Sequence, residues 1–347
     1  MMKRKIVFDG QVYAQRMTGQ YRYANELLKE LDKISNKNEF EIVIPKYVEV
    51  YPDFKNIKVV KYGNVKGILW SQTSLFIYLL KNNGISFGFC NTTQLLNPGI
   101  TAILDVGYKV QKRCYRNLYG RLSSLWHRLN YWVIAKSNKK IITISEFCKS
   151  EISSVYHVNP DRISVIPCGW QHYDRIIEDE TIFTYYPEIR KKQYYFALGS
   201  LEERKNFKWI VEVAKRNSDE MFVIAGGAVK NSKERMNFDC INNLKFVGYI
   251  SDGQAKSLMR NAKAFLFPST YEGFGIPPLE ALSVGTQVFC SDAACMPEVC
   301  EDSVTYFNPY HYDIKLEEYK VNKNCNALDK YSWKSSAKKL YELLKEI

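Results

Sequence analysis

The sequence predicts an α/β protein made of two Rossmann-like domains, on three observations. The chain has 347 residues, which is long for one domain and suits two. Short apolar runs of strand length alternate with segments whose apolar residues recur at helical spacing. In each half a glycine-containing loop leads from a strand to a helix start, at Gly19 and at 273–275. Ligands bind at such places in open α/β sheets.

In the first half, short strands surround one clear amphipathic helix. The helix is predicted over 21–31, where apolar residues follow the helical period. Apolar runs predict strands at 5–8, 40–44, 57–60, 102–104, 140–144 and 163–166.

The second half repeats the alternation of strand and helix after a polar, poorly periodic segment over 171–192, which we interpret as a hinge. Strands are predicted at 194–198, 221–225, 244–247, 264–267 and 288–290. Helices are predicted at 207–215, at 279–284 and at the C-terminus.

The stretch 264–291 carries the most informative chemistry. Its strand is followed by a glycine-containing loop, and Pro277 and Pro278 stand where a first helical turn tolerates proline. Backbone N–H groups at a helix start suit an anion such as a diphosphate. Glu272 and Glu280 frame this loop, and carboxylates accept hydrogen bonds from vicinal sugar hydroxyls. The stretch therefore indicates a cradle for a nucleotide sugar, and the alternative is an ordinary buried strand, turn and helix.

Three strings resemble one known family. They are Pro268-Ser269, Glu272-Gly273-Phe274-Gly275 and Pro278-Leu279-Glu280-Ala281. Together they resemble the signature of the retaining family 4 glycosyltransferases (glycosyl transferases group 1). This resemblance implies the GT-B fold, in which two Rossmann-like domains face each other across a cleft and a C-terminal helix crosses back to the first domain.

The resemblance implies roles for residues of the second half. The segment from Gly199 to Asn206 is similar to the family's Gly-x-Leu-x-x-Arg-Lys-Asn, whose basic pair contacts the donor phosphates. Arg204 and Lys205 take that role here, and in plain chemistry a mobile ammonium at a strand-to-helix turn suits a departing diphosphate. Glu272 would hold the donor sugar. The other implied donor-binding residues are Gly199, Asn206, Tyr249, Gly273, Phe274, Gly275, Ile276 and, for the ribose, Glu280.

The first half resembles the family in patches. The string from Thr18 to Tyr23 is similar to the Thr-Gly-x-x-Arg-Tyr element, and Ser145 falls in a similar Ser-x-Phe. Gly19 and Ser145 are therefore expected at the acceptor side of the cleft. Many relatives have His-Asp where this chain has Leu104 and Asp105, so no acid or base is assigned at 104, and Asp105 is carried over as a catalytic residue.

The implied domains are 1–170 for the acceptor, 171–192 as hinge, 193–330 for the nucleotide sugar and 331–347 as crossover helix. No cofactor or metal is expected beyond the nucleotide sugar as co-substrate. Cys290, Cys295 and Cys300 are regularly spaced, but none of the four histidines is near them, so packing is favoured over a metal site.

The excess of positive over negative charge lies entirely in the first half. Residues 1–170 hold 25 Lys and Arg against 12 Asp and Glu, whereas 171–347 hold 24 against 25. The segment 109–140 contains nine of these basic residues, aromatic residues and no acid. Its leucines, Leu118, Leu122, Leu125 and Leu129, recur at helical spacing, which predicts one buried or lipid-facing stripe. Either an anionic membrane surface or a core-packed helix with a solvated basic face fits this segment, and nucleic acid is a weaker alternative.

The predicted function is transfer of a hexose, with retention, from a nucleotide diphosphate sugar to a glycan or lipid-linked saccharide in bacterial surface polysaccharide synthesis. A phosphorylase or synthase of the same fold and a non-catalytic partner subunit are the alternatives. No apolar run reaches the roughly 18 residues of a spanning helix, and no signal peptide is evident. The expected location is the cytoplasm, including the inner face of the cell membrane.

Overall fold

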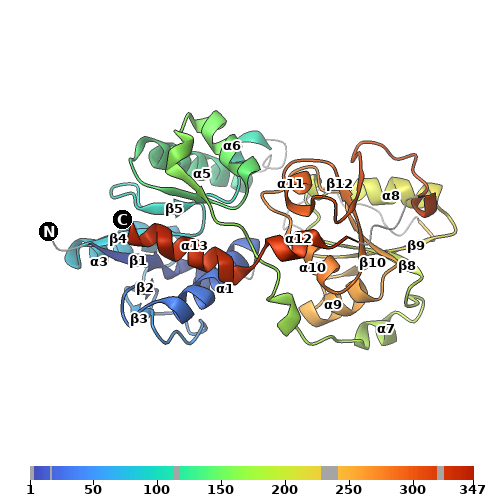
Figure 1. The fold of residues 1–347 in the computed structure, drawn as a ribbon, viewed down its shortest axis with the longest axis horizontal. Helices are drawn as coiled ribbons and strands as arrows, with labels where there is room; N and C mark the ends of the chain where they lie inside the picture. Colours follow the sequence, from blue (N-terminus) through green and yellow to red (C-terminus); the bar gives the residue numbers. More distant parts are fainter. Residues whose placement is uncertain (1–3, 16–17, 112–117, 228–240, 319–323) are drawn as a thin grey trace. The chain divides into compact units, whose positions relative to one another are not determined.

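The computed structural model describes residues 4–15, 18–111, 118–227, 241–318 and 324–347, and the chain divides into two compact units. The first unit consists of Met1–Gly169 and Trp333–Ile347, and the second of Trp170–Ser332. Each unit contains one sheet whose strand pairs are parallel (Figure 1). The predicted class, two Rossmann-like α/β domains, is confirmed.

The first unit is built on a seven-stranded sheet in the order β3-β2-β1-β4-β5-β6-β7. The chain builds outward from β1 in one direction and then continues from β4 in the other. The strands are β1 (Lys5–Asp9), β2 (Glu41–Ile44), β3 (Lys58–Lys61), β4 (Gly84–Gly88), β5 (Ile100–Ala102), β6 (Ile141–Thr143) and β7 (Ile163–Val165).

Helices make four of the six connections between these strands, and loops join β2 to β3 and β4 to β5. Thr18 caps the first α-helix, since its hydroxyl accepts a hydrogen bond from the N–H of Tyr21. The helical elements are η1 (Gly10–Ala14), α1 (Gly19–Ile34), α2 (Ile68–Trp70), η2 (Ser71–Leu75), α3 (Phe76–Lys81), α4 (Gly107–Val110), α5 (Leu118–Lys136), α6 (Glu146–Tyr156) and η4 (Pro160–Arg162).

The C-terminal helix α13 (Trp333–Lys345) belongs to the first unit, although the chain reaches it from the second. It lies along α1 (Figure 1). Trp333 is buried, and its ring centroid lies 6.2 Å from that of Tyr23 on α1. The Ser336 hydroxyl donates to the carbonyl of Pro167. The sequence-based expectation that the last helix returns to the first domain is confirmed.

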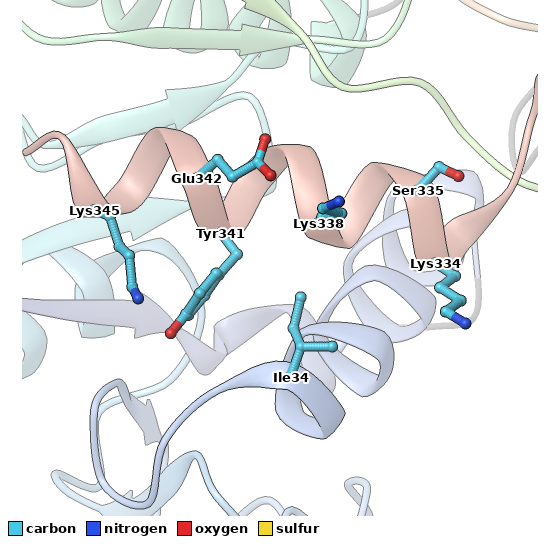
Figure 2. Close-up of a pocket in the computed structure, with 7 residues that line it drawn as sticks. All are labelled: Ile34, Lys334, Ser335, Lys338, Tyr341, Glu342 and Lys345. Atoms are coloured by element: carbon cyan, nitrogen blue, oxygen red, sulfur yellow. The ribbon is translucent and has the colours of Figure 1, made fainter.

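A hollow of about 690 Å³ lies on the first unit beside α1 and α13. Figure 2 shows the seven residues that line it, which are Ile34, Lys334, Ser335, Lys338, Tyr341, Glu342 and Lys345. None of them follows the carboxyl end of a strand, and none is among the predicted site residues. This hollow is therefore not the candidate functional site.

The second unit has a six-stranded sheet in the order β10-β9-β8-β11-β12-β13. Its strands are β8 (Tyr194–Leu198), β9 (Met221–Ala225), β10 (Leu244–Gly248), β11 (Ala264–Phe267), β12 (Gln287–Ser291) and β13 (Thr305–Phe307). The helical elements are η5 (Tyr173–Arg175), α7 (Thr181–Tyr185), η6 (Glu203–Lys205), α8 (Phe207–Arg216), α9 (Asp252–Arg260), α10 (Ile276–Ser283), α11 (Met296–Cys300), η8 (Leu316–Glu318) and α12 (Asn326–Lys330).

The segment 171–192, predicted as a hinge, is grouped with the second unit. Hydrogen bonds to its backbone hold it there. The Lys256 ammonium donates to the carbonyls of Tyr173 and Ile176, and the N–H of Asp179 donates to the carbonyl of Gly253. The lack of periodicity therefore marks an irregular segment packed on α9, and its action as a hinge stays a prediction.

Most predicted strands coincide with observed ones, and the differences have local causes. The strand predicted at 102–104 is observed at Ile100–Ala102, and it ends before Leu104, whose N–H is taken by the side chain of Asn91. The strands β4 and β13 were not predicted. Both contain polar residues or glycine, which weaken the apolar signal.

Helix α5 leaves its leucines in solvent. Exposed fractions are 75% for Leu118, 61% for Leu122, 64% for Leu125 and 42% for Leu129. The helix packs on the unit with other residues, among them Tyr131 and Ile134, which lie in a core cluster with β6, α6 and β7. The stripe predicted as buried or lipid-facing is thus not buried. Residues 112–117 of the segment 109–140 lie outside the described residues.

Candidate functional site

The order of strands in the second sheet defines where its loops diverge. From β8 the chain proceeds to β9 and β10 on one side, whereas β11, β12 and β13 lie on the other. The loops that follow β8 and β11 therefore leave the sheet in opposite directions, and such switch points are where open α/β sheets bind ligands. These two loops contain Arg204, Lys205 and Glu272, so the fold brings together residues that are more than 60 positions apart.

Two cations meet one carboxylate at this point. The Lys205 Nζ lies 2.6 Å from Glu272 Oε1, and Arg204 Nη1 lies 2.9 Å from Glu272 Oε2. Arg204 Nε also lies 2.6 Å from Glu202 Oε2. The side chains of Arg204 and Lys205 remain 25% and 13% exposed, which leaves their charges accessible to a small anion.

The electrostatics keep Glu272 ionised. Burial by itself would raise the pKa of this carboxyl, but the charges of Lys205 and Arg204 and hydrogen bonds from Lys205 and Ser269 outweigh burial and lower its pKa to about 2. At neutral pH Glu272 is therefore an acceptor of hydrogen bonds and not a proton donor.

Backbone contacts hold the two loops against each other. The N–H of Thr270 donates to the carbonyl of Arg204 over 2.8 Å. Asn206, which adopts the left-handed conformation at φ +54°, donates from its side-chain amide to the carbonyls of Pro268 and Pro309. The predicted donor-binding residue Asn206 thus fixes the loop geometry, and this contact positions its neighbour Lys205.

The glycine loop closes tightly before helix α10. Gly275 caps the helix at φ +80°, and a Cβ there would come within 2.6 Å of Met296 Sδ, so glycine is required. Gly273, Phe274 and Gly275 are buried, with the Phe274 ring edge-on to Tyr331 at 5.0 Å, whereas Ile276 is partly exposed. A ligand can therefore reach the cation pair more easily than the N–H groups of the two glycines.

The remaining predicted donor residues belong to the same unit. Gly199 directly follows β8 and is partly exposed, and Tyr249 follows β10 with 87% of its surface exposed. Glu280 lies on α10, where its Oε1 is 2.8 Å from Nε2 of His172. Both side chains of this pair are 5% exposed.

The predicted residues of the first unit follow the carboxyl ends of its strands but have structural contacts. The Ser145 hydroxyl is buried and caps α6 through the N–H of Cys148. The Asp105 carboxylate accepts from the N–H of Gly107, and the side chain of Leu104 is buried. Gly19 is the exposed first residue of α1, with no atom within 4 Å of a Cβ built on it.

Sequence reasoning missed two groups. His172 was included only in the hinge, yet it is the partner of Glu280. Asp9, at the carboxyl end of β1, was not singled out either. Burial raises the pKa of its carboxyl to about 6, although hydrogen bonds from Gln11 and Ser71 act to lower it. The signal for Asp9 was its position, because it ends the first apolar run directly before a polar loop.

Two negative findings bear on the candidate chemistry. In the described ranges, no group of three or more His, Cys, Asp or Glu side chains is arranged to hold a metal ion. Within the same part of the chain, every helix is too short or too polar to cross a membrane.

The fold is that of the GT-B glycosyltransferases: two parallel α/β units, with the last helix returning to the first unit. The second unit carries the cation–carboxylate cluster at its switch point. Residues 179–346 match the family described as glycosyl transferases group 1. This match covers most of the second unit and all of the last helix, and it agrees with the resemblance to glycosyl transferases group 1 found in the sequence.

Curated relatives include two mannosyltransferases. The chain is 26% identical over 188 residues to O-antigen chain mannosyltransferase B of Escherichia coli, covering 51% of this chain and 49% of the relative. It is 27% identical over 193 residues to O-antigen chain mannosyltransferase RfbU of Salmonella typhimurium, covering 54% and 52%. The chain thus spans about half the length of the curated relatives it matches.

Solved structures share the fold over nearly the whole chain. Sucrose-phosphate synthase from Thermosynechococcus elongatus has a TM-score of 0.72 at 13% identity and covers 99% of both chains. Anabaena HepE in complex with UDP-glucose has a TM-score of 0.72 at 13% identity, covering 99% of this chain and 100% of that one. WaaG, a glycosyltransferase involved in lipopolysaccharide biosynthesis, has a TM-score of 0.65 at 15% identity, with 97% and 95% covered.

Proposed function

We propose that this protein is a retaining glycosyltransferase that moves a hexose from a nucleotide diphosphate sugar to a glycan or lipid-linked saccharide in bacterial surface polysaccharide synthesis. The observation that carries the proposal is the cluster of Lys205, Arg204 and Glu272 at the switch point of the second sheet. The family match and the names of the curated relatives support the same class of reaction.

The cation pair would stabilise the leaving group. As the glycosidic bond breaks, negative charge grows on the β-phosphate, and preorganised cations stabilise that charge in the transition state. Lys205 and Arg204 are fixed by Glu272, so little reorganisation is needed when a diphosphate arrives. Two cations at one phosphate supply the charge that a metal ion otherwise supplies, and we propose a metal-independent reaction on this ground.

Glu272 would bind the sugar and not attack it. Its low pKa keeps it ionised, and it accepts hydrogen bonds from hydroxyls while balancing the two cations. We propose that the acceptor attacks on the face from which the diphosphate leaves, so that neither Glu272 nor Glu280 forms a covalent bond. Glu280 would bind the ribose, and the exposed ring of Tyr249 would contact the base of the nucleotide.

The acceptor would bind to the first unit, near Gly19, Asp105 and Ser145. Of these, Gly19 is the most accessible, since the Asp105 and Ser145 side chains already accept backbone N–H groups. With leucine at 104, no imidazole is available at that place to exchange a proton. Proton removal from the acceptor would then fall to the departing diphosphate.

The donor and the activity are tested together by incubating the protein with UDP-glucose, UDP-galactose, UDP-N-acetylglucosamine and GDP-mannose. We expect release of nucleoside diphosphate from one of them and, with an accepting glycan, a product whose anomeric configuration by NMR equals that of the donor. Release that requires inorganic phosphate would favour a phosphorylase. No release and no binding of any donor would favour a non-catalytic partner subunit, which Leu104 in place of histidine makes a real alternative.

We also propose that α5 lies on an anionic membrane surface, as part of action on a lipid-linked acceptor. The exposed leucines and the 56% exposed Trp132 recur every three or four residues, so they form one face. Arg121, Arg128 and Lys136 are exposed on the same helix, which carries no acidic residue. Apolar burial and attraction of basic residues to anionic lipids act together on such a helix. The protein would then be cytoplasmic and peripheral on the inner face of the membrane.

A further inference from the structure

A buried pair joins the segment 171–192 to the candidate donor site. Nε2 of His172 lies 2.8 Å from Oε1 of Glu280, across 108 positions of sequence, and both side chains are 5% exposed. A hydrogen bond between two buried side chains restricts the rotamers of both, so this contact fixes the orientation of the Glu280 carboxyl group.

The backbone on both sides of His172 is held in place. Trp170 donates from its indole to the carbonyl of Leu328, and Gln171 donates from its amide to the carbonyl of Tyr331. On the other side, the Lys256 ammonium donates to the carbonyl of Tyr173. His172 is thus held in place inside the second unit and is not a mobile surface histidine.

The same short stretch also touches the glycine loop. Tyr331, whose carbonyl accepts from Gln171, packs edge-on against Phe274 with ring centroids 5.0 Å apart. Residues 170–172 therefore contact the candidate donor site in two ways: His172 contacts Glu280 directly, and Gln171 contacts Phe274 indirectly through Tyr331.

We propose that His172 is a positioning residue that orients Glu280 for recognition of the ribose hydroxyls of the donor nucleotide. The inference rests on the proposed function, because it needs a nucleoside diphosphate at this site. A side chain that is already fixed in one orientation loses less entropy when it accepts a hydrogen bond from a hydroxyl. Without His172, the buried Glu280 side chain would lose this contact and the orientation that the contact sets.

The test is calorimetric binding of UDP and GDP, each compared with its 2′-deoxy and 3′-deoxy forms, to the full chain. We expect the wild type to prefer the ribonucleotide by roughly 10- to 100-fold over at least one deoxy form, as for a hydrogen bond to a charged group. His172→Ala should reduce this ratio to near one by weakening the ribonucleotide alone. His172→Gln, whose amide can hydrogen-bond to Glu280 in place of Nε2, should restore most of the ratio.

The ratio separates positioning from a general structural role, because a partly unfolded variant loses affinity for both nucleotides equally. An unchanged ratio in His172→Ala would overturn the inference while leaving the proposed function intact. A wild type that binds ribonucleotide and deoxynucleotide equally would remove the role of Glu280, and the inference with it. A wild type that binds neither UDP nor GDP would overturn the proposed function itself.

Discussion

The ammonium of Lys205 lies 2.6 Å from the carboxylate of Glu272, and the two residues come from loops on opposite sides of a switch point in one parallel sheet. The Lys205 ammonium also lies 5.4 Å from the centroid of the Phe267 ring. Glu272 and this ring fix the cation at the carboxyl ends of β8 and β11. The place fits a diphosphate, since a fixed cation and partial exposure are combined there.

Replacement of Lys205 by alanine tests the role of this cation in catalysis. We expect turnover to fall by about 10²- to 10³-fold, the usual loss when one donor to the transition state is removed. The matched control is Lys208→Ala, which removes an exposed lysine three residues later on α8. Initial rates of nucleoside diphosphate release measure both. Equal rates for the two variants would remove Lys205 from the reaction.

The low pKa of Glu272 predicts a pH dependence of stability. A carboxyl whose pKa is lowered to about 2 on folding stabilises the folded state above its ordinary pKa, and this contribution is lost as the pH falls from about 4.5 toward 2. The contribution is on the order of 3 kcal/mol, from the size of the shift. Glu272→Gln should therefore flatten the fall of the free energy of unfolding between pH 5 and 3, as measured by urea denaturation. Curves of equal slope for wild type and variant would contradict the assignment.

The exposed face of α5 predicts binding to anionic vesicles. Leu122→Glu combined with Leu125→Glu should weaken binding to phosphatidylglycerol-containing vesicles by at least about tenfold, since the variant adds charge where apolar burial is needed. The control is Leu96→Glu, which changes a leucine of the first unit that is 83% exposed but lies outside this helix. Sedimentation with vesicles measures all three proteins. If the wild type does not sediment with vesicles, the proposed docking is wrong.

Docking of the last helix predicts the stability of the first unit. Trp333 is 2% exposed and packs on Tyr23, so Trp333→Ala should lower the free energy of unfolding by about 3–5 kcal/mol. Lys334→Ala, at the exposed neighbouring position, should leave it unchanged within about 0.5 kcal/mol. Denaturation followed by circular dichroism compares them. Similar midpoints for the two variants would show that α13 is not an integral part of the unit.

The sequence was sufficient for much of the fold, because local patterns specify local structure. The apolar run at 264–267 with Pro277 and Pro278 downstream predicted β11 and α10 correctly. The C-terminal helix and its return to the first unit followed from the family resemblance. The strings that resemble glycosyl transferases group 1 lie within residues 179–346, which match that family.

The contacts within the site could not be predicted from local patterns. Glu272 was expected to hold a sugar, but its pairing with Lys205 and Arg204 depends on two loops that only the sheet order brings together. His172 meets Glu280 across 108 positions for the same reason. Periodicity predicted α5 as a helix but could not decide which of its sides packs on the first unit. The side opposite the leucines carries Tyr131 and Ile134, and these two residues are buried instead.

The most direct measurement of the central claim is a crystal structure of the protein with UDP or GDP bound. The account predicts the β-phosphate within hydrogen-bonding distance, about 3 Å, of Lys205 Nζ and the Arg204 guanidinium, with the ribose against Glu280. A nucleotide bound elsewhere, with Lys205 and Arg204 in contact with no phosphate oxygen, would contradict this expectation.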